Sequence, residues 1–256
     1  ARGPTRAQAA ACAAGTHSIV DAVRDIQHGR ADVMLAGGAE SPLTPLGVGG
    51  FEAMRALSTR TDVPEDASRP FDADRDGFVL GEGAGILVLE AESRARERGA
   101  TRYATVSGEA MTADAHHPTK PAVNGVGLGR CVERALESAN LSHSAVDHVN
   151  AHATSTPIGD AAEANALNDI FDSAPPTTSV KSQLGHALGA AGAIEAVVTA
   201  QTVAKQTLPP TINYNTPDPD CQLPVVTTPT EAAVETVVST SAGFGGSNGA
   251  LIFEDP

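Results

Sequence analysis

Cys12 lies in a run of small residues, alanines and one glycine at positions 9–15, directly before an expected helix. Small neighbours leave the sulfur open to a substrate and let the backbone approach it. Apolar residues recur at helical spacing after this run and predict a helix over about 15–28. Because the positive end of a helix macrodipole favours thiolate, this position suits a nucleophilic cysteine. For the cysteine considered alone, a buried small hydrophobe is the alternative.

Two histidines have similar surroundings further along the chain. His152 follows a predicted strand in Val-Asn-Ala-His-Ala-Thr-Ser-Thr-Pro, and His186 follows a short strand and precedes a helix rich in glycine and alanine. Small flanking residues suit a site where a substrate must reach an imidazole. A single histidine so placed is more often structural. With Cys12 also present, the functional and structural interpretations weigh about equally.

The composition limits the class of protein. The chain has 256 residues, of which 41% are hydrophobic and 19% charged, as in an ordinary soluble globular protein. Its three widely spaced cysteines (Cys12, Cys131 and Cys221) lack the spacing of metal ligands and indicate a reducing cytoplasm. The net charge of −14 argues against nucleic acid or an anionic membrane as a partner. Since Cys12 lies so near the first residue, an alanine, we expect the chain to be a piece of a longer polypeptide.

Strands and helices alternate along the chain, which predicts an α/β fold with a layered architecture. Strands are expected at 31–38, 78–80, 85–89, 103–106, 146–151, 178–180, 234–240 and 249–254, and helices at 15–28, 50–57, 90–98, 127–138, 160–171 and 187–205. Ala-Ala-Gly opens both the first and the last of these helices. This similarity fits a fold of two similar halves, each with a central helix.

Three local patterns resemble binding motifs but do not complete them. The acidic segment 72–77 begins like a calcium-binding loop, yet Gly83 stands where that loop needs a glutamate. The glycines of 81–85 lack the spacing of a dinucleotide fingerprint. His116 and His117 suit a loop near the site entrance better than a set of metal ligands. No metal site and no cofactor are therefore expected.

Four segments occur here in a recognisable order. They are Ala-Ala-Cys-Ala-Ala-Gly at 10–15, Asn-Ala-His-Ala-Thr-Ser-Thr-Pro at 150–157, Val-Lys-Ser-x-x-Gly-His-x-x-Gly-Ala-Ala-Gly at 180–192 and Gly-Phe-Gly-Gly-Ser-Asn at 243–248. Together with 45–51, 57–60 and 68–72, they resemble the elongating β-ketoacyl-ACP synthases of the thiolase-like superfamily, along the whole chain.

The resemblance implies the thiolase-like layered α-β-α-β-α fold, of which this chain supplies the later part. Residues 1–256 would be the C-terminal portion of a ketosynthase. Roughly 1–100 would end the N-terminal half of the fold, and roughly 101–256 would form the C-terminal half. The family's N-terminal segment before the nucleophile is expected to be missing here, so the chain should not fold alone.

The resemblance also implies roles for individual residues. Cys12 would take the acyl group as a thioester, and the backbone N–H groups of Cys12 and Phe244 would form the oxyanion hole. Phe244 would also gate the acyl pocket. His152 and His186 would assist decarboxylation of malonyl-ACP, and Lys181 matches the family's active-site lysine. Acidic residues that could pair with this lysine are Asp160, Glu163 and Glu195, and residues matching contacts to the phosphopantetheine arm are Thr154 and Thr156.

The function implied is that of a 3-oxoacyl-[acyl-carrier-protein] synthase in fatty-acid elongation. A ketosynthase subunit of a type II polyketide synthase and a non-catalytic chain-length partner subunit remain alternatives. The implied partners are acyl carrier protein and a second ketosynthase-like subunit, in a homodimer or a heterodimer. Because carrier protein is acidic, an acidic chain must focus positive charge locally. The candidate docking residues are Arg55, Arg60, Lys120 and Arg130.

Overall fold

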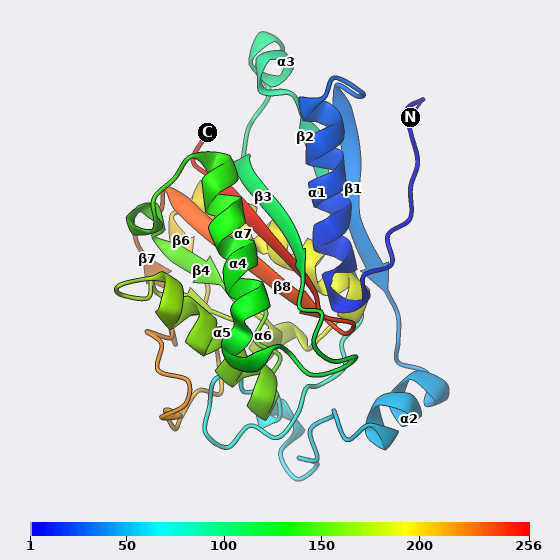
Figure 1. Cartoon of the computed structure of the whole chain (residues 1–256), viewed down its shortest axis with the longest axis vertical. Coiled ribbons are helices and arrows are strands. Elements are labelled where there is room, and N and C mark those ends of the chain that lie inside the picture. Colours follow the sequence, from blue (N-terminus) through cyan, green and yellow to red (C-terminus); the bar gives the residue numbers. More distant parts are fainter. Residues whose placement is uncertain (1) are drawn as a thin grey trace.

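The computed structural model describes residues 2–256 and is built around a five-stranded mixed sheet (Figure 1). Its strands, in spatial order, are β3 (Thr105–Ala113), β9 (Ser247–Glu254), β8 (Thr236–Gly243), β4 (His148–Asn150) and β5 (Thr177–Thr178). The strands β8, β4 and β5 run parallel, whereas β9 is antiparallel to both β3 and β8. The three parallel strands therefore end at one edge of the sheet.

The central strands of this sheet are buried on both faces. Val238 and Ile252, on β8 and β9, belong to one hydrophobic cluster, while their neighbours Val237 and Leu251 belong to another. Successive side chains of a strand point to opposite faces, so two apolar layers must cover the sheet. This explains why β8 and β9 are nearly continuous runs of apolar and small residues.

Helices α4 (Val126–Ala139) and α5 (Pro157–Ile170) cover the first face, in front of the sheet in Figure 1. Val132 and Leu136 of α4 and Leu167 of α5 are almost completely buried there. Proline at the first position of α5 begins the helix, because its missing N–H would have no partner in the first turn.

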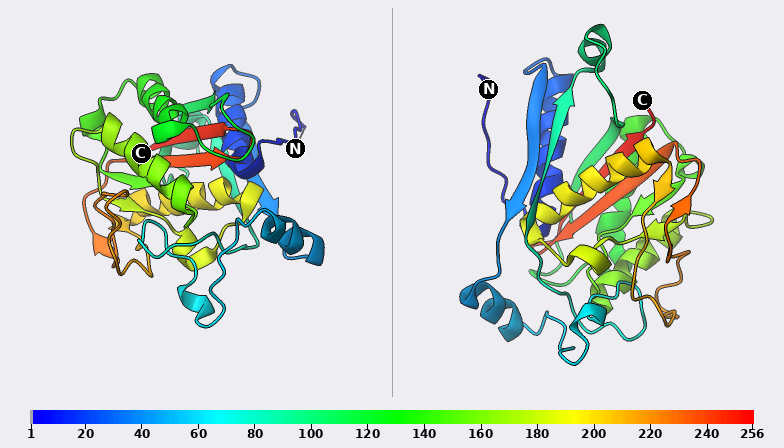
Figure 2. Two further views of the ribbon diagram at one scale, coloured as in Figure 1. Left: turned by 60° about the horizontal axis from the view of Figure 1, so that its bottom comes forward. Right: turned by 180° about the vertical axis from the view of Figure 1, so that it is seen from behind.

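Helices α1 (Ala14–Gln27) and α7 (Ala191–Lys205) join the second cluster, and Figure 2 shows α7 crossing that face. They contact each other closely. A Cβ atom at Gly15 of α1 would lie 2.8 Å from the backbone nitrogen of Ala193 in α7. The antiparallel pair β1 (Val33–Glu40) and β2 (Gly83–Glu90) packs against these helices from the other side. The layers are thus β, α, β and α.

The remaining elements are short. They are helices α2 (Pro45–Ala53), α3 (Glu92–Glu97) and α6 (Lys181–Leu184), strands β6 (Thr207–Leu208) and β7 (Thr230–Glu231), and single 3-10 turns at Ala11–Ala13, Pro64–Asp66, Val123–Gly125, His143–Ala145 and Leu188–Ala190.

The helix predicted at 50–57 begins earlier, because Thr44 caps it by accepting a hydrogen bond from Gly47 N–H. It ends before Arg55, whose φ is 54°. The strand predicted at 78–80 forms only isolated bridges.

The two central helices begin in the same way. A 3-10 turn precedes each, and the first residue of each turn is left-handed, with φ of 46° at Ala11 and 45° at Leu188. The sequences that follow align residue for residue, so that Gly189 takes the place of Cys12. The backbone therefore repeats the internal similarity predicted from the Ala-Ala-Gly segments.

One apolar face of β1 and β2 is exposed. Its members are Val33, Leu35, Ile86 and Val88, with 41%, 65%, 57% and 66% of their surface accessible. Leu35 and Val88 are direct cross-strand partners. We call these four residues the β1–β2 outer face; no part of residues 2–256 covers it. Within the same residues, no helix is long and apolar enough to cross a membrane.

Candidate active site

Three parallel strands carry candidate residues to one edge of the sheet. Phe244 directly follows β8, His152 follows β4, and Lys181 follows β5 as the first residue of α6. In open α/β sheets, the carboxyl ends of parallel strands are the usual place for a ligand. Three segments far apart in the sequence therefore meet at this edge.

Cys12 reaches the same place from the 3-10 turn that precedes α1. The turn after β8 packs directly against it, since a Cβ atom at Gly243 would lie 2.6 Å from the carbonyl oxygen of Ala10 and 3.2 Å from the nitrogen of Cys12. Only glycine permits this approach. It brings the backbone N–H of Phe244 toward the Cys12 sulfur, where this group acts to lower the pKa of the thiol.

A cavity of about 430 Å³ opens at this point. Its wall contains Cys12, His152, His186 and Phe244, together with Thr154 and Thr156, which the sequence analysis assigned to one site. Apolar side chains, among them Phe51, Met54, Phe78, Leu128, Ile158 and Leu188, form much of the remaining wall. The cavity thus joins a sulfur, two imidazoles and an apolar space, which suits an acyl group bound as a thioester.

The Cys12 thiol is less acidic than its position before a helix predicts. Burial raises its pKa to about 11, although the Lys181 ammonium and the Phe244 N–H group both act to lower it. Only 9% of the residue is exposed. Loss of solvation thus outweighs the groups that favour thiolate, and the net effect is opposite to the one expected from the position of Cys12 before a helix.

His152 and His186 are in edge-to-face contact, with ring centroids 5.4 Å apart and planes at 85°. Burial, and after it the positive charge of Lys181, lowers the pKa of both rings well below the usual value. Both are therefore neutral near neutral pH. Lys181 Nζ lies 3.5 Å from His152 Nδ1. Because an ammonium group only donates, Nδ1 accepts and Nε2 carries the ring proton of His152.

Lys181 forms its ion pair with Glu195 of α7, and both side chains are almost fully buried. Burial raises the pKa of Glu195 to about 7, against the effect of the neighbouring ammonium. Of the three acidic residues that the sequence offered as partners of the lysine, Glu195 alone makes this contact.

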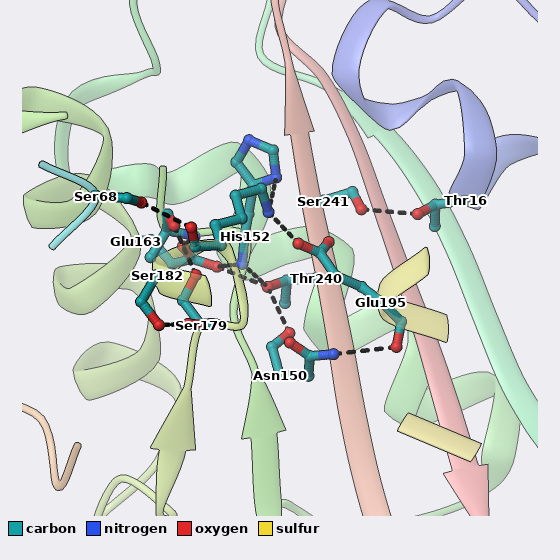
Figure 3. Close-up of polar contacts among 12 residues, drawn as sticks. Thr16, Ser68, Asn150, His152, Glu163, Ser179, Ser182, Glu195, Thr240 and Ser241 are labelled. Atoms are coloured by element: carbon teal, nitrogen blue, oxygen red, sulfur yellow. Dashed lines mark hydrogen bonds and ion pairs between the residues drawn. The ribbon is translucent and has the colours of Figure 1, made fainter. Parts of the chain in front are cut away.

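The other two carboxylates hold loops in place. Asp160 lies 3.6 Å from the Arg75 guanidinium and accepts hydrogen bonds from the N–H groups of Phe71 and Ser155. Burial raises the pKa of Asp160 to about 6. Glu163 accepts hydrogen bonds from the backbone at His152 (Figure 3). Arg75 was not predicted as a site residue, since nothing in the local sequence marks it as a buried cation.

Thr154 and Thr156 line the cavity beside Gly159, and their hydroxyl oxygens are 3.0 Å apart. Thr156 also stands at the N-terminal end of α5. The structure therefore places both hydroxyls where a polar arm could contact them at the wall of the cavity.

The four candidate docking cations separate into two pairs. Arg55 and Lys120 are exposed and line the cavity, next to the loop that carries His116 and His117. Arg60 and Arg130 are not among the lining residues. Arg60 instead donates to the carbonyl oxygen of Asp74.

A row of aromatic rings, not predicted from the sequence, leads from α2 to the histidines. Phe51 contacts Phe78 edge to face at 5.3 Å, and Phe78 contacts His186 at the same centroid distance. His186 Nδ1 is buried and has no hydrogen-bond partner among residues 2–256. Ring contacts therefore orient this imidazole. The sequence did not predict these contacts, because Phe51 and Phe78 are far apart in the chain.

The residues around the cavity supply a nucleophile, hydrogen-bond donors and imidazoles for acyl transfer. Within residues 2–256, no group of three or more histidine, cysteine, aspartate and glutamate side chains is placed to hold a metal ion. The sulfur can attack a carbonyl, the N–H groups at Cys12 and Phe244 can stabilise the resulting oxyanion, and a neutral imidazole can donate a hydrogen bond.

Two family models match the chain. The model for the N-terminal domain of beta-ketoacyl synthase matches residues 1–95, and that for the C-terminal domain matches residues 103–215. Curated relatives include the mitochondrial 3-oxoacyl-[acyl-carrier-protein] synthase of Arabidopsis thaliana, 48% identical over 98% of this chain and 56% of the relative. The 3-oxoacyl-[acyl-carrier-protein] synthase 2 of Coxiella burnetii is 47% identical over 98% of this chain and 62% of the relative.

Solved structures with the same fold include a ketosynthase in complex with its type II polyketide acyl-carrier protein, with a TM-score of 0.94 and 41% identity. That match covers 96% of this chain and 62% of the other. A beta-ketoacyl synthase from Burkholderia phymatum matches with a TM-score of 0.93 and 41% identity, over 97% of this chain and 61% of the other. The chain thus spans about three fifths of the length of these relatives.

Proposed function

The chain belongs to the beta-ketoacyl synthase family, and we propose that its site performs the decarboxylative condensation of an acyl thioester on Cys12 with malonyl-ACP. The product would be a 3-oxoacyl-ACP, as the names of its curated relatives describe. The observation that carries this proposal is the convergence of Cys12, His152, His186 and Phe244 on one cavity.

In the first half-reaction, the Cys12 sulfur attacks the thioester carbonyl of acyl-ACP. The pantetheine thiol leaves and takes a proton, and the acyl group remains on the cysteine. Since the thiol has a pKa of about 11, its proton must leave as the sulfur attacks. The N–H groups of Cys12 and Phe244 would stabilise the negative oxygen of the tetrahedral intermediate.

In the second half-reaction, malonyl-ACP enters with its thioester oxygen toward the two imidazoles. Loss of CO2 leaves an enolate, which a neutral histidine stabilises by donating a hydrogen bond. The enolate carbon then attacks the acyl-Cys12 carbonyl, and the cysteine sulfur leaves. The lowered pKa values of His152 and His186 support this role, because a neutral imidazole still has one N–H group that can donate a hydrogen bond to the enolate oxygen.

Mass spectrometry of the intact protein tests the proposal. Incubation with acyl-ACP should add one acyl mass, on the peptide that contains Cys12. Cys12→Ala should abolish this addition, whereas Cys131→Ala, at a buried cysteine away from the cavity, should not. Acylation that persists in Cys12→Ala would show that another residue is the nucleophile.

A ketosynthase subunit of a type II polyketide synthase is the second candidate. The structural match to a ketosynthase bound to its polyketide carrier protein favours it. The products separate the two candidates: repeated condensation without reduction gives poly-β-keto chains, whereas fatty-acid elongation adds one unit before the keto group is reduced. A non-catalytic chain-length subunit is disfavoured, since Cys12 and both histidines are present.

We infer that acyl carrier protein docks at the cavity mouth and that a ketosynthase-like subunit pairs with this chain, as a homodimer or a heterodimer. Among solved relatives are a ketosynthase with its carrier protein and one with its chain length factor. All three cysteines are unpaired, which supports a reducing compartment such as the cytoplasm.

We also infer that the rest of the family's fold covers the β1–β2 outer face. Residues 1–100 would then end one half of the fold and residues 101–256 form the other. Four large apolar side chains rarely stay exposed together in a monomer, and the longer relatives supply further chain to cover them. The intact mass of the native protein tests this inference, because a mass of 25.9 kDa without an associated polypeptide would contradict it.

A further inference from the structure

Strand β8 carries a fully buried hydroxyl that no motif of the sequence singled out. Thr240 lies on β8 beside β4, with its side chain directed at the loop that begins after β4 (Figure 3). Its Oγ1 accepts a hydrogen bond from the N–H of His152 at 3.1 Å and donates one to Glu163 Oε1 at 2.6 Å. One hydroxyl therefore contacts both the backbone of His152 and the carboxylate that supports it.

Glu163 holds the two consecutive peptide groups on either side of the His152 Cα atom. Its Oε1 accepts the His152 N–H at 2.9 Å, and its Oε2 accepts the Ala153 N–H at 2.7 Å. Thr240 supplies a third donor. The nearest cation, Lys181, forms its ion pair with Glu195 instead. The Glu163 carboxylate is thus held by three hydrogen-bond donors without a direct ion pair among the described residues.

This arrangement favours the ionised form of Glu163. A carboxylate accepts hydrogen bonds from all three donors at once, whereas a protonated carboxyl would lose the hydrogen bond that Thr240 donates. Burial raises the pKa of Glu163, and the Thr240 hydroxyl is the first of the groups that lower it, followed by the two N–H groups and the charge of Lys181. The other ionisable groups near this carboxylate are Asp160 on α5, His152 after β4 and Glu195 on α7.

We propose that Thr240 is a positioning residue, which holds the Glu163 side chain in place and thereby fixes the backbone, and so the imidazole, of His152. The proposal rests on the condensing function proposed above, in which His152 stabilises the enolate. Thr240 touches neither the substrate nor the reacting atoms, since it does not line the cavity. Loss of the Thr240 hydroxyl should therefore slow the condensation step, which uses His152, and leave the rate of Cys12 acylation unchanged.

Thr240→Val and Thr240→Ser test the proposal in the complete native protein. Valine keeps the shape and removes the hydroxyl, and a lost hydrogen bond to a buried charge corresponds to about tenfold to a hundredfold in rate. We expect that loss in kcat for condensation with malonyl-ACP, while acylation of Cys12 stays within about twofold of wild type. Serine restores the hydroxyl and should restore most of kcat.

The pH profile separates positioning from a general loss of structure. Removal of the donor raises the pKa of Glu163 further, so the acidic limb of condensation should move to higher pH in Thr240→Val and return in Thr240→Ser. Amide hydrogen exchange at His152 and Ala153 should become faster in the valine variant. Thr178→Val is the matched control: its hydroxyl is also buried and contacts His148, on β4 but outside the cavity.

The outcomes distinguish the two proposals. Wild-type protein that acylates Cys12 but never condenses would overturn the proposed function. An active wild type with unchanged kcat and pH profile in Thr240→Val would overturn the positioning role alone. Equal losses of acylation and condensation, without rescue by serine or matched by Thr178→Val, would show that Thr240 acts only on stability.

Discussion

At Cys12, two electrostatic influences oppose each other. The ammonium of Lys181 and the N–H of Phe244 favour a negative sulfur, while exclusion of water disfavours it. The second effect is larger, so the resting nucleophile is a thiol. Its reactivity must therefore depend on the substrate, whose carbonyl accepts charge as the sulfur loses its proton.

The reactivity of Cys12 should follow this raised pKa. The thiolate fraction, and hence the rate of alkylation by iodoacetamide, should increase about tenfold per pH unit between about pH 7 and 10, because those values lie below the pKa of about 11. Peptide mapping by mass spectrometry measures the rate at each pH, with the fully buried Cys131 and Cys221 as internal controls. A plateau already reached near pH 8 would contradict a raised pKa.

Some site residues can be recognised from sequence motifs, whereas others are recognised only from their neighbours in the folded structure. Cys12, His152 and His186 could be named from their flanking small residues, and the structure places them around one cavity; their catalytic roles stay predictions. Thr240 and Arg75 could not be named. Each contacts partners that are distant in sequence. A local pattern shows neither that the Thr240 hydroxyl is buried nor that the Arg75 guanidinium lies beside Asp160.

At the scale of elements, the approach of α1 to α7 decides where the nucleophile lies. Gly15 stands three residues after Cys12, and its backbone rests against Ala193 of α7. Any side chain here would push α1 away from α7 and carry the 3-10 turn with it. The small residues around the nucleophile therefore serve helix packing as much as substrate access.

Gly15→Ala should destabilise the protein by about 1–3 kcal/mol, because the new Cβ lies 2.8 Å from Ala193 N, where the backbone cannot yield easily. Gly129→Ala on α4 is the matched control. Its nearest neighbour to a new Cβ is 3.7 Å away, so alanine should stabilise that helix by about 0.5–1 kcal/mol. Urea unfolding of both variants measures the difference, and equal stabilities would refute this account of the packing.

Periodicity predicted the long elements better than the short ones. The long elements lie close to their predicted ranges, because in each of them the apolar pattern extends over several helical turns or over most of a strand. These elements are helices α1, α4, α5 and α7 and strands β1, β8 and β9. The start of α2 depends on a cap at Thr44, and β3 continues to Ala113, well past the predicted end. β5 has two residues, and the two-stranded sheet of β6 and β7 was missed.

At the scale of the whole molecule, a strongly acidic chain presents basic groups at the mouth of its cavity. The net charge is −14, yet Arg55 and Lys120 both stand at this opening. The carboxylates of the chain, Asp76 and Asp114 at the same cavity among them, would repel an acidic partner, so Arg55 and Lys120 are the groups that can attract and orient it there. Docking should therefore depend on few residues and on ionic strength.

Arg55→Glu should slow acyl transfer from carrier protein by about tenfold at low salt and change transfer from a small acyl thioester much less, since only the protein partner meets the reversed charge. Arg130→Glu is the control, because Arg130 is also exposed but does not line the cavity. The rate of Cys12 acylation, measured with both acyl donors, provides the comparison. Equal slowing with both donors, or equal effects of the two variants, would exclude a docking role for Arg55.

The matched left-handed residues before α1 and α7 mean that the molecule offers two nearly equivalent places for a reactive atom. One holds a sulfur and the other, at Gly189, a single hydrogen. The main chain follows a similar course at both positions, with a left-handed residue and a 3-10 turn before each helix, so the side chain is the clearest difference between them. A repeated backbone of this kind can therefore carry the reactive atom at one copy and none at the other.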